Sequence, residues 1–181
     1  MMELLAFGDT GWGDELLLSM VMTILVSTSS LAFGLIIGTI FASFKLSNSY
    51  ILKAIAEFYT TVVRGVPELL VIYLLFFGGS GAVMYVAKIF GHMGYIELSP
   101  FTIGTIAVGA ISGAYSTEVI RGAILAVPKG QFEAAQTLGM AKYAMSFKVI
   151  FPQVARLALP GIGNVWQVTL KDTALISVTG L

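Results

Sequence analysis

The chain contains 181 residues, of which 57% are apolar and 11% are charged, with ten basic and ten acidic residues. Because soluble domains carry about 25% charged residues, this composition excludes an ordinary water-exposed domain. It contains no cysteine and a single histidine, His92, which excludes thiol catalysis, disulfides and Cys/His metal sites. The zero net charge gives no general attraction to nucleic acid, and the sequence has no P-loop for binding ATP.

Three apolar segments in the first two thirds of the chain predict membrane-spanning helices, each of which requires about 20 residues. Residues 16–44 and 98–117 are free of charge and predict the first and third spans. Residues 69–87 predict the second, which alternatively starts near Tyr59 with an interruption at Pro67. The third span carries small residues whose spacing allows another helix to approach closely, namely Gly104, Gly109, Ala110 and Gly113.

The C-terminal part of the chain predicts a fourth span and the start of a fifth. Residues 149–170 can cross the membrane if Arg156 lies near the interface and extends its charge toward water. Residues 173–181 are apolar but provide only about half the length of a crossing. We therefore expect four full spans followed by a short apolar segment, which is either a truncated fifth span in a fragment or an unusual end.

The basic residues predict the orientation, since short loops rich in Lys and Arg remain in the cytoplasm. Eight of the ten lie either between the first two spans or around the loop after the third. Residues 1–15 contain four acids and no base, and the loop between the second and third spans has only Lys88. We expect a periplasmic N-terminal segment at 1–15 and a cytoplasmic loop at 122–148.

This loop contains the one extended polar segment, and residues 131–138 predict a short exposed helix that ends at Gly139. Phe132, Ala135 and Leu138 would form a small apolar ridge on it, of the kind that fits a groove in a partner protein. The alternative is an amphipathic helix lying on the membrane, which the scarcity of Lys and Arg on its polar face does not favour.

A motif in this loop resembles a known family. Glu133-Ala134-Ala135, followed by Gly139 and then by Val149-Ile150-Phe151-Pro152, is similar to the EAA signature of the membrane subunits of bacterial ABC importers. Further segments resemble the polar amino-acid, histidine-permease subgroup: Arg64-Gly65-Val66-Pro67, Gly113-Ala114-Tyr115, Val127-Pro128-Lys129-Gly130-Gln131, and Pro160 to Asn164 leading to Lys171-Asp172-Thr173. Within that subgroup, the stretch from Gly161 to Leu175 and the acidic N-terminus are most similar to permeases for basic amino acids and for opines such as octopine or nopaline.

The resemblance implies an all-α integral membrane permease with the type I importer (MetI-like) fold, in a domain at 16–181, from which this sequence departs by ending within the fifth helix. It implies no enzymatic activity and no bound cofactor, because ATP and Mg²⁺ belong to a dimer of partner ATPases. The other implied partners are a sister or identical permease, a periplasmic substrate-binding protein and the lipid bilayer of the inner membrane. The coupling helix that docks on the ATPase would use Gln131, Glu133, Ala134, Ala135 and Gly139.

Polar residues within predicted spans are the candidates for a substrate path, because they are costly in lipid. Asp172 could face a cationic group of an amino acid or opine, unless Lys171 and Asp172 mark a helix break in contact with water. Asn164, Gln167 and Lys171 share one helix face, with bonds to other helices as the alternative role. Thr173 completes this set by the family resemblance.

Two further places are structural candidates. Glu118 and Arg121 are spaced for a local ion pair, and Arg64, Gly65 and Pro67 mark a helix break that could act as a hinge. Two other functions compete with the importer subunit, namely a secondary transporter or channel and a membrane scaffold. Both leave the coupling motif without a role.

Overall fold

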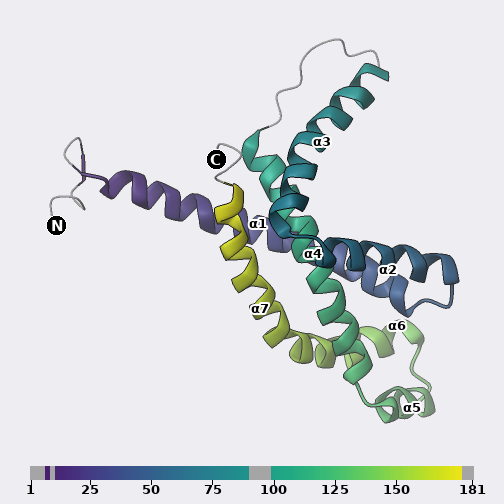
Figure 1. The fold of residues 1–181 in the computed structure, drawn as a ribbon. Helices are drawn as coiled ribbons and strands as arrows, with labels where there is room; N and C mark the ends of the chain where they lie inside the picture. The colour runs from purple at the N-terminus through teal and green to yellow at the C-terminus, as the bar shows by residue number, and fades with distance from the viewer. Residues whose placement is uncertain (1–6, 9–10, 90–98, 177–181) are drawn as a thin grey trace.

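The computed structural model describes residues 7–8, 11–89 and 99–176, and every regular element in this part of the chain is helical (Figure 1). The all-α class predicted from the sequence is therefore confirmed. The elements in chain order are α1 (Gly13–Leu46), α2 (Tyr50–Gly65), α3 (Glu68–Ile89), α4 (Pro100–Ala126), α5 (Lys129–Thr137), α6 (Lys142–Met145), the π-helical turn η2 (Ser146–Ile150) and α7 (Phe151–Ile176).

Helices α1 and α4 form the closest helix pair of the fold and run in the same direction. Gly34 lies against Gly113, and Gly38 lies against Ser116, so residue numbers increase together along the contact. A Cβ atom on Gly34 would come within 2.9 Å of the backbone nitrogen of Gly113. The predicted close approach at the small residues of α4 is thus confirmed, and its partner is the Gly34/Gly38 pair of α1.

The segment before α4 is a broken helix. Helix α2 ends at Gly65, α3 begins at Glu68, and the two are bent by 113°. Pro67 has no amide hydrogen to continue the helical ladder, so the predicted interruption is confirmed. The predicted segment 69–87 corresponds to α3, whereas the alternative start near Tyr59 is wrong, since α2 begins at Tyr50 and packs on α1 and α4. The sequence did not indicate this start because Lys53 and Glu57 interrupt the apolar residues of α2.

Helix α7 runs antiparallel to α4, since Gly161 contacts Val119 at one end and Ile176 contacts Gly104 at the other. The helix continues without interruption to Ile176. The alternative of a break at Lys171 and Asp172 is therefore wrong, and so is a separate fifth segment beginning at Thr173. Asp172 is 5% exposed and lies against Glu68 of α3, so this part of α7 is packed within the protein and not in contact with water.

Two described helices, α1 and α4, are long and apolar enough to cross a membrane, and the bent pair α2 and α3 would make a third span. Many large apolar side chains of these helices are exposed, as a lipid environment requires. Helix α7 has 26 residues but falls outside that count, because polar residues recur along it. Its role as the fourth span remains a prediction.

The elements α5, α6 and η2 connect α4 to α7 and lie together at one end of these two helices (Figure 1). Val127, Ala135, Met145 and Ile150 form a buried apolar cluster that joins them. The larger core lies between α1, α3, α4 and α7 and includes Val26, Ile72, Val108, Ile111 and Ile176. The connecting segment is therefore a small packed unit with its own core.

Candidate functional site

The break between α2 and α3 brings two acidic side chains together in the protein interior. Asp172 of α7 is only 5% exposed, and its carboxyl group lies within reach of that of Glu68, the half-buried first residue of α3. The Tyr115 hydroxyl of α4 donates a hydrogen bond of 3.0 Å to Glu68 Oε1. Two neighbouring carboxyl groups, one of them buried, repel each other when both are ionised. The arrangement therefore favours a cation.

Arg64 flanks this acidic pair. Its guanidinium carbon lies 5.5 Å from the centre of the Tyr115 ring, and its Nη1 lies 3.9 Å from Glu118 Oε1. Because Gly65 and Pro67 end α2 directly after Arg64, the break positions both Arg64 and Glu68 beside Tyr115. The predicted hinge residues thus lie directly before Glu68, with Arg64 beside Tyr115.

An ionic network around Glu118 joins three helices. Lys45 of α1 has a side chain only 4% exposed, and its Nζ lies 2.5 Å from Glu118 and 3.0 Å from Glu57 of α2. Arg121 Nε donates a 3.2 Å bond to Glu118, which confirms the expected local pair. The sequence did not indicate Lys45 and Glu57 as members, since both lie far from Glu118 in the chain.

The predicted polar stripe of α7 lies on another face from Asp172. Asn164, Gln167 and Lys171 are exposed, and the described residues provide none of them with a hydrogen bond or ion pair. Within the described part of the chain the stripe therefore makes no bond to another helix, and its roles in a substrate path or in bonds to other helices stay predictions. The stripe faces whatever surrounds the chain.

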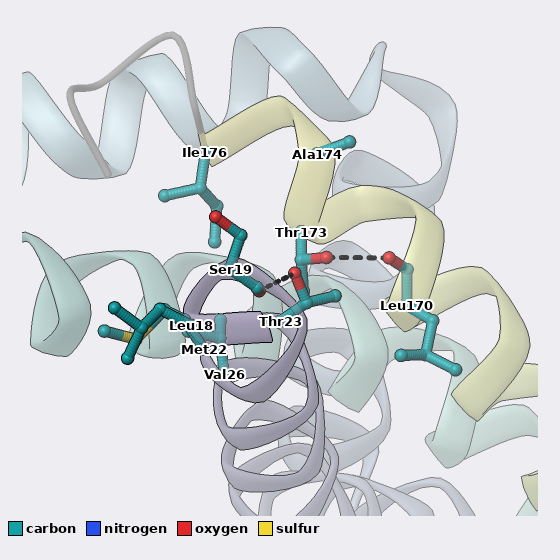
Figure 2. A pocket seen from close by; sticks show the side chains of 9 residues that line it. All are labelled: Leu18, Ser19, Met22, Thr23, Val26, Leu170, Thr173, Ala174 and Ile176. Carbon is teal, nitrogen blue, oxygen red and sulfur yellow. Dashed lines mark hydrogen bonds between the residues drawn. The ribbon is translucent and has the colours of Figure 1, made fainter. Parts of the chain in front are cut away.

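Thr173 belongs to a third environment, a pocket of about 640 Å³ between α1 and α7 (Figure 2). The lining is mainly apolar and has no charged side chain. The Thr173 and Thr23 hydroxyls donate to backbone carbonyls of their own helices, at 2.7 Å and 2.8 Å. This pocket therefore lacks the groups that would recognise a charged ligand, and the acidic pair of Glu68 and Asp172 lies elsewhere.

Helix α5 matches the prediction in position but differs in its exposed face. It ends at Thr137, and Gly139 adopts the positive φ of 69° that favours glycine. Ala135 is 3% exposed and packs with Phe132 in the cluster beneath α5, whereas Leu138 is 80% exposed. The expected exposed ridge of Phe132, Ala135 and Leu138 is wrong, because the first two residues hold α5 on its own chain.

The outer surface of α5 contains Glu133 and Ala134, both exposed. Gln131 is tied to the start of α7, since Gln153 Nε2 donates a 3.2 Å bond to its Oε1. The exposed side of α5 is therefore mostly polar, and the helix projects beyond α4 and α7 (Figure 1). Such a face can enter a groove of another protein.

The sequence analysis identified only one member of the acidic pair. Asp172 was a candidate, but Glu68 and Tyr115 were not, because Glu68 directly follows Pro67 at the edge of a predicted span. The break itself provided a signal, since an acid at the first turn after a helix interruption within a span lies at membrane depth. His92 and most of the segment 1–15 lie outside the described residues.

Residues 34–181 match the family described as binding-protein-dependent transport system inner membrane component. This chain belongs to that family. The match includes α5, both members of the acidic pair and the whole of α7. The chain is thus a multi-pass membrane permease component, and the secondary transporter and scaffold functions are not favoured.

Two relatives show how far the similarity extends. The nopaline transport system permease protein NocQ of Agrobacterium fabrum is 54% identical over 181 residues, which cover 99% of this permease and 77% of NocQ. The histidine/lysine/arginine/ornithine transport system permease protein HisQ of Escherichia coli is 43% identical over 171 residues, covering 94% of this permease and 75% of HisQ.

The fold agrees with a solved structure of the same kind. The crystal structure of an amino acid ABC transporter with histidines matches with a TM-score of 0.70 and 34% identity, over 89% of this permease and 70% of that chain. The permease therefore has the fold of an ABC importer membrane subunit, as the sequence motif predicted.

Proposed function

We propose that the permease moves a cationic amino acid or opine inward across the bacterial inner membrane, with Glu68 and Asp172 binding the cationic group. The observation that carries this proposal is the acidic pair at the helix break, formed by the buried Asp172 and the half-buried Glu68. A guanidinium or ammonium group placed between the two carboxyls would relieve their repulsion and bond to both. The names of NocQ and HisQ, which refer to an opine and to basic amino acids, support the same substrate class.

Substitution of Asp172 by Asn tests this assignment. A lost bond between charged groups costs about 1.5–3 kcal/mol, so the KM for arginine uptake should rise at least about tenfold. The assay is ATP-driven arginine uptake into proteoliposomes containing the complete transporter. Lys88→Gln, an exposed change in the last turn of α3, is the control. An unchanged KM in Asp172→Asn would refute the role of the acidic pair.

The driving force in this proposal comes from a dimer of ATPases that bind the exposed face of α5 and hydrolyse ATP with Mg²⁺, while the permease itself binds no cofactor. Glu133 and Ala134 would contact the ATPase, Gly139 would end the helix at the required angle, and Gln131 would transmit motion to α7 through Gln153. Ala135 would act from beneath by seating α5. Closure of the ATPases would then move α4 and α7 as a two-state element.

The exposed polar stripe of Asn164, Gln167 and Lys171 would face a second permease, either identical or a sister subunit. Polar side chains exposed to lipid are costly, whereas a water-filled path between two permeases would accommodate them. Thr173 would lie at the edge of this path, and a periplasmic substrate-binding protein would deliver the substrate to it.

The orientation in the proposal places α5 and the loop 122–148 in the cytoplasm and the N-terminal segment 1–15 in the periplasm. The gathering of Lys45 and Arg121 around Glu118, at the end of α4 nearest to α5, supports it, because basic residues accumulate on the cytoplasmic side. Residues 16–181 would then form one permease domain.

A further inference from the structure

A row of aromatic side chains lies on the exposed side of α6, η2 and the start of α7. Tyr143 and Phe147 have ring centres 4.6 Å apart, and those of Phe147 and Phe151 are 6.2 Å apart. The three residues are 74%, 56% and 61% exposed, so no part of the described chain covers them. Met145 and Ile150, in the same stretch, are instead buried against α5. One side of this segment thus supports the coupling helix, and the other is bare.

Cations accompany this row, and acids are missing. Lys142, Lys148 and Arg156 are all exposed, whereas the sequence contains no Asp or Glu between Glu133 and Asp172. We name the five residues Tyr143, Phe147, Phe151, Lys142 and Lys148 the aromatic–basic surface, and Arg156 lies further along α7. A ligand of this surface must be anionic and must also have an apolar part that contacts the rings.

We propose that the aromatic–basic surface binds anionic phospholipid of the cytoplasmic leaflet. The membrane would then hold α6 and η2 in place, and these elements support α5. The proposal rests on the orientation proposed above, which places this surface at the membrane boundary where α7 begins. Aromatic rings concentrate at that depth, and lysine and arginine beside it attract anionic headgroups. A phospholipid provides both a phosphate for the cations and acyl chains for the rings.

The connection to transport is mechanical. Lipid bound on the exposed side of α6 and η2 would fix Met145 and Ile150, which contact Ala135 of α5 on the other side. The π-helical turn at Ser146–Ile150 lies between the two sides. Because π-helical turns are less regular than α-helix and often occur at functional sites, this turn is a place where lipid contact can alter the position of α5.

A tryptophan at position 147 provides the test. In a complete permease with Trp12→Phe and Trp166→Phe, Phe147→Trp reports on contact with brominated lipids in nanodiscs of phosphatidylcholine with 20% phosphatidylglycerol, on the order of a natural anionic fraction. In each sample only one of the two lipids is brominated, and the amount of brominated lipid is the same in both samples. We expect the brominated phosphatidylglycerol to quench at least about threefold more than the brominated phosphatidylcholine, because each nearby cation favours the anionic lipid.

Charge variants then identify the cause. Lys142→Gln with Lys148→Gln should abolish the preference for phosphatidylglycerol, whereas Lys53→Gln with Lys88→Gln, which removes the same charge from other exposed positions, should preserve it. Equal quenching by both lipids in the parent would overturn the proposal. So would an absence of quenching together with shielding that appears only when the ATPase is bound, which would assign the surface to the protein partner. Neither outcome depends on transport, which the arginine uptake assay measures separately.

Discussion

Gly34→Ala should loosen the contact between α1 and α4 on which the whole fold depends. The added Cβ would lie 2.9 Å from Gly113 N and 3.0 Å from Gly109 O. Both are backbone atoms, which no change of rotamer can move, so the helices must separate by several tenths of an ångström to restore ordinary contact. Every side chain along the shared interface would lose part of its packing as a result.

The magnitude follows from two opposing terms. Overpacking of this kind costs up to about 3 kcal/mol, and alanine is a better helix former than glycine by about 1 kcal/mol. The net loss of unfolding free energy is therefore about 2 kcal/mol, which lowers the midpoint of thermal unfolding by about 4–8 °C. The midpoint can be measured by size-exclusion chromatography after heating in detergent.

Gly163→Ala is the matched control for this prediction. Gly163 is also within a helix, but a Cβ atom there has nothing within 4 Å. The same change should therefore stabilise the protein slightly, by about 0.5–1 kcal/mol. If Gly34→Ala proved as stable as Gly163→Ala, the close packing of α1 on α4 would be refuted.

Two further substitutions test the remaining packing. Glu118→Gln leaves the buried Lys45 with only Glu57, whose side chain is 62% exposed. This change should lower the unfolding free energy by roughly 1–3 kcal/mol, whereas Glu57→Gln should change it by less than about 1 kcal/mol. Equal effects of the two substitutions would contradict the central role of Glu118. Ala135→Leu should displace α5 and abolish co-purification of the ATPase. Leu138→Ala should leave α5 in place, since Leu138 is 80% exposed. Retention of the ATPase by Ala135→Leu would contradict the role of Ala135 in packing α5 onto the chain.

Much of the fold followed from local patterns in the sequence. The apolar runs located α1 and α4, Pro67 located the break, and Gly139 located the end of α5, because each signal depends on neighbouring residues alone. The i,i+3 spacing of Glu118 and Arg121 likewise fixed their pairing. Such features require no knowledge of tertiary contacts.

The remaining features depend on which helix faces which. Periodicity placed Asn164 and Gln167 on one face of α7 but could not show that this face is exposed, whereas Asp172 points to Glu68. The same limit applies to α5, where spacing grouped Ala135 with Leu138 although only Ala135 packs inward. The meeting of residues far apart in the chain is set by the packing of α3, α4 and α7.

The central claim is that an ATPase docks on α5, and the natural absence of cysteine from the sequence allows a direct test. A single cysteine at Ala134 should form a cross-link to a cysteine in the groove of the ATPase when the complex is assembled in nanodiscs. A cysteine at Leu18, an exposed position in the first turns of α1, should not. Cross-linking at Ala134 alone would support the account, whereas a complex in which Ala134 never cross-links would contradict it.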